Sequence, residues 1–424
     1  MSPDPSLARR LGTADAVVIG LGSMIGAGVF VAFGPAARAA GTGLLIGLVI
    51  AAVIAYCNAM ASAHLAAKYP TSGGTYIYGR ERLGPWWGFI AGWGFVIGKT
   101  ASCAAMALTF AAYAVPGPWW AQRGVAVAGV VALAALNYRG VTKTAMLTRA
   151  LVATSLIALA AVVVGIALGG EASPAKIDWP DMGADDAYGI MQAAGLLFFA
   201  FAGYARIATM GEEVRDPKRT IPRAIRSALL ITVAIYLVVA VAALLAAGPE
   251  SLANSSAPLT TAVDAAGATA LAPVVRIGAA LASLGALLAL IAGIGRTSLA
   301  MARHGDLPGW LSAVHPRYRV PHHAEIALAV VVCVVVATVD VRGAIGFSSF
   351  GVLVYYTIAN ASAYTLVQQR RWRWLSVLGA FGCVLLVSTL PWPSVVAGLA
   401  MFAVGIVVRT VVLVRRKPGN DLSK

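Results

Sequence analysis

Charged residues are scarce in this chain, and their scarcity excludes most classes of protein. Asp, Glu, Lys and Arg together make up 12% of the 424 residues, whereas hydrophobic residues make up 59% and the mean hydropathy is +0.81. A soluble domain of this length cannot bury so much apolar surface. Runs of about 20 apolar residues, by contrast, are long enough to cross a bilayer. The composition therefore predicts an all-helical, multi-pass membrane protein.

Cysteines and catalytic constellations are also scarce. The four cysteines (Cys57, Cys103, Cys333 and Cys383) all lie in apolar segments, so we interpret them as small buried hydrophobes rather than disulfide partners or metal ligands. The sequence contains no paired carboxylates, nucleophile elbow, phosphate-binding loop or Cys/His metal pattern. It therefore predicts that the protein is not an enzyme and holds no cofactor and no metal.

Twelve apolar segments are long enough to span a membrane. They cover 13–36, 42–67, 84–113, 121–138, 146–168, 188–210, 225–247, 270–300, 325–341, 343–367, 374–390 and 393–412. With this topology, 24 of the 32 Lys and Arg residues fall on the side of the two tails and five on the other. Cytoplasmic loops are enriched in Lys and Arg. The net charge of +15 thus indicates cytoplasmic termini in the plasma membrane rather than a nucleic acid partner.

Glycines interrupt the first and the sixth of these segments. Gly20, Gly22, Gly26 and Gly28 break the first, so we expect residues 23–28 to be unwound. In hydrocarbon an unpaired backbone group costs several kcal/mol, so such a break persists only beside a polar cavity. Interrupted helices five spans apart are typical of an inverted repeat with a midplane binding site. Alternatively, the glycines allow close helix packing.

Several motifs in the same order resemble those of the amino acid–polyamine–organocation superfamily of permeases. GSMIGAGVF (22–30) is similar to the family's first-helix motif, and YPTSGGTY (69–76) with GPWWGFIAGW (84–93) to its second loop. FFAFAG (198–203) with GEEVRDPKRTIP (211–222) resembles the sixth helix and its following loop, and MARHGDLP (301–308) the end of the eighth helix.

This resemblance implies a LeuT-like fold with two five-helix inverted repeats, 13–168 and 188–367, two extra helices (374–412) and cytoplasmic tails (1–12 and 413–424). It implies a permease that carries amino acids across the plasma membrane by alternating access, possible partners being a co-transported proton or sodium ion. The alternatives are an exporter or exchanger, a polyamine or organic amine carrier, and a non-transporting amino acid sensor. The exact substrate, the coupling ion and the oligomeric state stay open.

The resemblance also implies how an amino acid is held. Amides of the first break bind its carboxylate, and carbonyls of the two breaks, here Val18–Ser23 and Phe198–Phe201, bind its ammonium. Half-helix N-termini favour anions and unwound carbonyls favour cations. The substrate-binding residues that we predict are Ser23, Met24, Ile25, Gly26, Ala27, Gly28, Phe198, Phe201, Ala202, Gly203, Lys99 and Arg206.

Lys99 and Arg206 are the two cations of this set. Lys99 lies in the middle of the third segment, where a cation costs at least about 3 kcal/mol. Arg206 follows the sixth-segment break, and Ala202 takes a position that is often acidic in relatives of cationic preference. Two embedded cations without an embedded carboxylate favour neutral or acidic substrates over cationic ones. Alternatively, Lys99 snorkels to an interface, and Arg206 faces cytoplasmic water or Glu212 and Glu213.

Two further pairs complete the prediction. Phe201 and Tyr204 are candidate aromatic gates, although aromatics in spans more often serve packing. Ser155 and Ser283 form a possible sodium site, although each hydroxyl can equally donate to its own helix. The sequence does not decide among proton symport, sodium symport, exchange and uncoupled transport.

Overall fold

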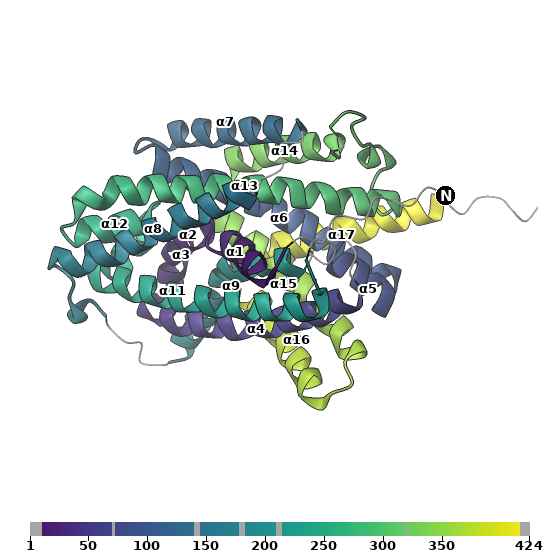
Figure 1. The fold of residues 1–424 in the computed structure, drawn as a ribbon, viewed down its shortest axis with the longest axis horizontal. Coiled ribbons are helices and arrows are strands. Elements are labelled where there is room, and N and C mark those ends of the chain that lie inside the picture. The colour runs from purple at the N-terminus through teal and green to yellow at the C-terminus, as the bar shows by residue number, and fades with distance from the viewer. Residues whose placement is uncertain are drawn as a thin grey trace, which may run out of the picture.

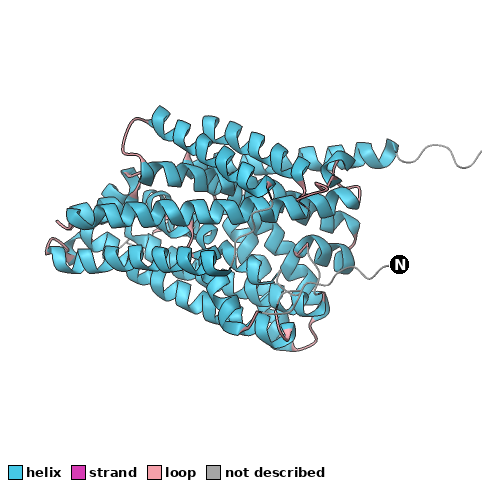
Figure 2. Cartoon of the chain, turned by 45° about the horizontal axis from the view of Figure 1, so that its top comes forward, coloured by secondary structure: helices cyan, strands magenta, loops and turns pink. Residues whose placement is uncertain are grey.

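A computed structural model describes residues 11–69, 73–139, 145–177, 183–208, 214–318 and 320–415. In this part of the chain the regular elements are all helices (Figure 2), and the single β-bridge joins Leu11 to Val214. The α-helices are α1 (Thr13–Met24), α2 (Ala27–Val31), α3 (Phe33–Ala40), α4 (Leu44–Lys68), α5 (Thr75–Leu83), α6 (Pro85–Ala114), α7 (Trp119–Tyr138), α8 (Ala145–Gly169), α9 (Ala184–Phe201), α10 (Ala205–Ala208), α11 (Pro217–Asn254), α12 (Pro258–Ala265), α13 (Ala272–Arg303), α14 (His322–Thr338), α15 (Val341–Leu366), α16 (Arg370–Thr389) and α17 (Trp392–Arg415).

The described helices confirm an all-helical, multi-pass membrane protein. Eleven of them, or continuous groups of them, are long and apolar enough to cross a bilayer. The remaining predicted span, 325–341, corresponds to α14, an apolar helix of 17 residues. At about 1.5 Å per residue α14 is roughly 26 Å long, which is shorter than a typical hydrocarbon core. The count of twelve spans therefore remains a prediction.

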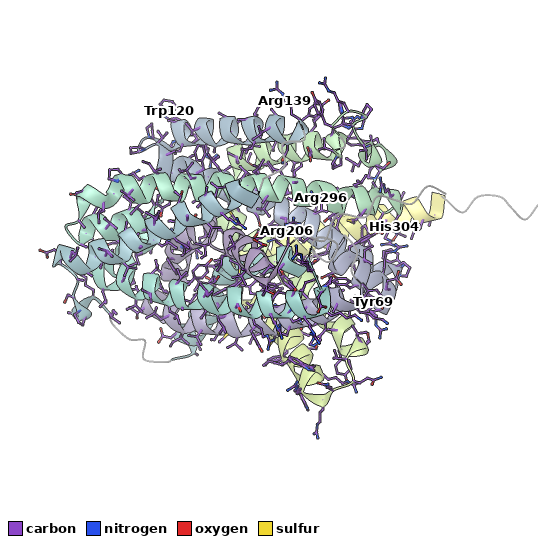
Figure 3. The ribbon with its side chains drawn as sticks, viewed as in Figure 1. Tyr69, Trp120, Arg139, Arg206, Arg296 and His304 are labelled. Carbon is purple, nitrogen blue, oxygen red and sulfur yellow. The ribbon has the colours of Figure 1, made fainter. Side chains whose placement is uncertain are left out.

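Several of the long helices, such as α7, α11 and α13, run along the longest axis of the molecule. In Figure 1, α13 crosses the whole view, with α7 and α14 on one side of it and α1, α8 and α11 on the other. Figure 3 shows Tyr69 and His304 at one end of the bundle and Trp120 at the opposite end of α7 from Arg139. Tyr69 and His304 therefore share an end, as the alternating topology requires of the loops that carry them.

Both predicted breaks are present, but the first is shorter than expected, and the second starts later, since Phe198–Phe201 lie within α9. In the first span α1 ends at Met24, and only Ile25 and Gly26 lie outside a helix before α2 begins at Ala27. The break is not 23–28 because the Ile25 amide still donates to the Leu21 carbonyl at 2.7 Å and continues the turn. In the sixth span α9 gives way to a 3₁₀ turn over Ala202–Tyr204 and then to α10.

Two short helices and an extension were not predicted. Helix α5 lies in the loop after α4, and α12 follows the kink of α11 at Gly248, whose φ is +72°. Helix α11 also begins at Pro217, eight residues before the predicted span at 225. Proline is tolerated at a first helical position because the amide that it lacks has no intrahelical acceptor there.

A buried ionic cluster ties four elements together at the end of the bundle that carries His304. Asp306, just after α13, accepts hydrogen bonds from Tyr76 Oη at 2.9 Å and Arg80 Nη1 at 3.3 Å. It also forms an ion pair with Arg409 Nη2 at 3.1 Å. The Asp306 and Arg409 side chains are only 6% and 5% exposed. The Arg409 guanidinium also lies 4.7 Å and 4.5 Å from the ring centroids of Trp86 and Phe89. The cluster therefore joins α5, α6, α13 and α17.

Burial and the negative charge of Asp306 raise the pKa of the Tyr76 phenol well above its usual range. Tyr76 therefore stays protonated at physiological pH and remains a donor to the carboxylate. The Asp306 carboxylate therefore has three partners in this cluster, two arginines and a neutral tyrosine.

Substitution of Asp306 by Asn should destabilise the protein strongly, because Arg409 would stay buried without its countercharge. Breaking a buried ion pair in this way costs about 3–5 kcal/mol. The measurement is the melting temperature of the purified protein in detergent. Glu81→Ala is the matched control, since Glu81 is an exposed carboxylate on the same helix as Arg80. Equal melting temperatures for the two variants would show that the cluster contributes little.

Candidate functional site

The two breaks cross at van der Waals contact, and glycine makes this possible. A Cβ atom on Gly203 would overlap the carbonyl of Ser23 and lie 2.7 Å from the Met24 nitrogen. A Cβ atom on Gly28 would lie 2.7 Å from the Cα atom of Ala200. Real Cβ atoms do not approach so closely. Close packing, the alternative reading of the glycines, therefore holds at these positions together with the break.

Tyr236 of α11 joins the two broken spans. Its hydroxyl lies 2.6 Å from the Met24 carbonyl and 3.1 Å from the Ala200 carbonyl and donates to them. These carbonyls belong to the last turns of α1 and α9, which lack intrahelical donors. Tyr236 is fully within the core at 1% exposure. Sequence reasoning missed it, because a tyrosine in an apolar helix carries no signal that separates it from packing residues.

Two adjoining cavities lie beside the crossing. The larger, about 310 Å³, is bounded by α1, α8 and α13 and is called here the α8 cavity. The smaller, about 160 Å³, is bounded by α6, α9, α10, α13 and α15 and is called here the α6 cavity. Their shared lining is Ser23, Arg206, Ala289, Gly293 and Arg296. Together they offer space of the size that small-molecule sites occupy, roughly 300–1,000 Å³.

About half of the predicted site residues line these cavities. Ser23, Lys99, Ala202, Gly203 and Arg206 line the α6 cavity, and Ile25 joins Ser23 and Arg206 at the α8 cavity. The other predicted residues whose side chains are described pack into the protein instead: Met24, Gly26, Gly28, Phe198 and Phe201. The Ala27 side chain lies outside what the structure describes.

Lys99 lies deep in the protein rather than at an interface. It is 7% exposed, sits midway along the 30-residue α6 and lines the α6 cavity. Among the described residues, no Asp or Glu forms an ion pair with it. From the middle of a helix about 45 Å long, its side chain is too short to reach either interface.

Arg206 and Arg296 stand at the junction of the two cavities. Arg206 comes from α10 and Arg296 from α13, and Figure 3 labels both between the two ends of the bundle. Counting charges by loop placed Arg296 among the cytoplasmic cations, whereas it lies inside α13, about two turns before the helix ends. Glu212 and Glu213, the partners considered for Arg206, lie outside the described residues.

The candidate ion and gating residues fall in packed surroundings. The Ser155 and Ser283 hydroxyls donate to Leu151 and Ala279 in their own helices, at 2.8 Å and 2.7 Å. Ser155 also lines the α8 cavity, and Ser283 is fully buried. Phe201 packs on Tyr236, and Tyr204 on Tyr356, with centroid separations of 5.1 Å and 5.2 Å. Neither aromatic ring lines a cavity, and their gating role stays a prediction.

The two ends of the bundle differ in how they are closed. The α8 cavity reaches Leu11 and Asn137, which lie near the start of α1 and the end of α7. Toward the other end, the Tyr113 hydroxyl donates to the Phe30 carbonyl at 2.7 Å and accepts from the Leu259 amide at 3.2 Å. Arg38 donates to the Ala253 carbonyl there at 2.7 Å. The α8 cavity thus extends toward one end, and these hydrogen bonds join helices at the other; the first end has interhelical contacts of its own, such as the Arg149–Asp15 ion pair.

Comparison with known proteins gives matches over nearly the whole chain. Residues 11–416 match the sequence family described as amino acid permease. An uncharacterised transporter of Mycobacterium tuberculosis is 61% identical over 408 residues, which cover 95% of this chain and 91% of that protein. A branched-chain amino acid permease of Bacillus subtilis is 27% identical, with 96% of this chain and 93% of that protein covered. A cationic amino acid transporter of Arabidopsis thaliana is 27% identical, with 92% and 72% covered.

Replacing Gly203 by Ala should separate the two breaks and reduce both stability and transport. The new methyl group has no space beside the Ser23 carbonyl, and overpacking of this kind costs about 1–3 kcal/mol. The melting temperature in detergent and solute uptake into proteoliposomes measure the two effects. Gly124→Ala in α7 is the control, because nothing lies within 4 Å of its added Cβ atom. A Gly203→Ala protein as stable and active as the Gly124→Ala protein would contradict the contact.

Proposed function

Because this chain belongs to the amino acid permease family, we propose that it carries amino acids across the plasma membrane by alternating access and prefers neutral or acidic substrates to cationic ones. The resemblance drawn from the motifs is confirmed, and with it a multi-pass amino acid transporter that is not an enzyme. The substrate class and the transport cycle are the proposed part.

The arrangement of the cavities is the observation that carries this proposal. They adjoin the crossing of the two broken spans and reach toward one end of the bundle, while Tyr113 and Arg38 close the other end. Alternating access needs a central site that is open to one side and sealed from the other. We assign the open side to the cytoplasm, together with both termini, because most Lys and Arg residues lie there.

The breaks supply groups that suit the two charges of an amino acid. The amides at the start of α2, from Ala27 onward, have no intrahelical acceptor and suit a carboxylate. The last carbonyls of α1 and α9 suit an ammonium. In this scheme helices α1–α8 and α9–α15 form the two inverted repeats of a LeuT-like arrangement, and α16 and α17 are the additional helices.

The charges of the lining disfavour a cationic substrate. Lys99 and Arg206 line the α6 cavity, and the described lining contains no Asp or Glu. A second positive charge at about 4 Å from one of them is opposed by roughly 4 kcal/mol at an effective dielectric of 20. The small Ala202 beside them offers no compensating charge. The Arabidopsis relative is named as a cationic amino acid transporter, so transport of lysine is the result that would contradict this argument.

Counterflow into proteoliposomes tests the proposal directly. Vesicles that contain the purified protein are loaded with one unlabelled amino acid, and entry of labelled leucine, glutamate and lysine is followed. Entry driven by neutral or acidic amino acids, but not by lysine, is the expected result. Strong lysine counterflow would support amino acid transport but overturn the argument that the cavity cations exclude cationic substrates. An absence of counterflow with every amino acid would overturn the proposed function.

Lys99→Ala and Arg206→Ala should each change selectivity, with lysine competing about tenfold better than against the unmodified protein. Removing one cation lowers the repulsion that excludes the lysine side chain. The measurement is inhibition of labelled leucine or glutamate counterflow by unlabelled lysine. Arg303→Ala serves as the control, since Arg303 is exposed on α13 and lines neither cavity. If both cavity variants matched this control, the role of the two cations would be disproved.

A further inference from the structure

One face of α13 has little side-chain bulk where it borders the cavities. Its middle consists of small residues that recur on one side of the helix: Ala282, Gly285, Ala286, Ala289 and Gly293. Arg296 is the next residue on this face, three positions after Gly293. It lines both cavities and is exposed, although α13 packs against α6, α8 and α14. Its side chain is therefore available to a solute in the cavities.

Arg296 raises the number of cations at the α6 cavity to three. Lys99, Arg206 and Arg296 line it from three different helices, and its described lining has no carboxylate. Glu325 of α14 interacts electrostatically with Arg296, but it is 3% exposed, packs beside Gly295 and lines neither cavity. Arg206 has an interaction partner of its own, so only Lys99 and Arg296 are counted here, and Glu325 alone does not balance these two cations. The cavity thus presents excess positive charge to whatever enters it.

A zwitterionic amino acid cannot balance this charge. In the proposed binding mode its carboxylate and its ammonium are both engaged at the breaks, and they cancel each other. A second carboxylate, on the side chain, would bring the missing negative charge. The planar guanidinium of arginine matches a carboxylate in a bidentate pair, which gives both strength and orientation.

We propose that Arg296 is a specificity-determining residue that binds the side-chain carboxylate of an acidic amino acid in the α6 cavity. Lys99 adds to the positive potential around this group. The proposal rests on the proposed function and narrows its substrate class from neutral or acidic amino acids to acidic ones.

Glutamate and glutamine form the sharpest pair of probes, since they differ only in the side-chain carboxylate and amide. The full-length protein in proteoliposomes is assayed for counterflow of labelled glutamate, with unlabelled glutamate or glutamine as competitor. We expect glutamate to inhibit at about tenfold or more lower concentration than glutamine. Arg296→Gln should remove most of this difference, whereas the control Arg303→Gln should keep it.

Each remaining outcome has a defined meaning. Equal inhibition by glutamate and glutamine in the unmodified protein, or an unchanged ratio in Arg296→Gln, would overturn the inference. Counterflow of leucine without any of glutamate would overturn it too, while the proposed function would stand. If no amino acid shows counterflow, both this inference and the proposed function are overturned. Should Arg296→Gln not yield folded protein, Arg296→Lys replaces it. The preference for glutamate over glutamine must then fall, because lysine keeps the positive charge but cannot form the bidentate pair.

Discussion

The contact between the Ser23 carbonyl and Gly203 is the constraint on which the rest of the structure depends. It brings two interrupted spans, far apart in the sequence, to the closest distance that backbones allow. Tyr236 then donates to a carbonyl from each of them, so that two chain segments with incomplete helical bonding share one donor. The cavities adjoin this crossing, and their shared lining includes Ser23 and Arg206 from its two sides. A larger residue at 203 would move the walls of both.

The protein treats its embedded cations in two different ways. Arg409 is enclosed by Asp306, Trp86 and Phe89, so its charge is balanced by a carboxylate and by aromatic rings. Lys99 and Arg296 border open volume instead, and among the described residues neither forms an ion pair with a carboxylate within 4 Å. The first arrangement contributes structure because both charges are fixed. The second leaves positive potential in a cavity, which is what a site for an anionic group requires.

Sequence reasoning located the spans and the two breaks because glycine spacing and apolar length act locally. It also identified Lys99, since a cation in the middle of an apolar helix is conspicuous. It misjudged the extent of the first break, which depends on one hydrogen bond from Ile25 to Leu21. It missed Tyr236 and Arg296, because the role of each depends on which neighbouring helix it faces.

The cluster around Asp306 has a consequence for how the chain is completed. Tyr76, Arg80 and Asp306 are all synthesised well before Arg409, which arrives on the last helix. Until α17 inserts, Asp306 has only its first two partners, and the faces of Trp86 and Phe89 lack the guanidinium that covers them. A nascent chain that stops before residue 409 thus lacks one of the two arginines that meet Asp306 and leaves these two rings without their cation. The cluster is therefore complete only once α17 has packed against α5, α6 and the end of α13.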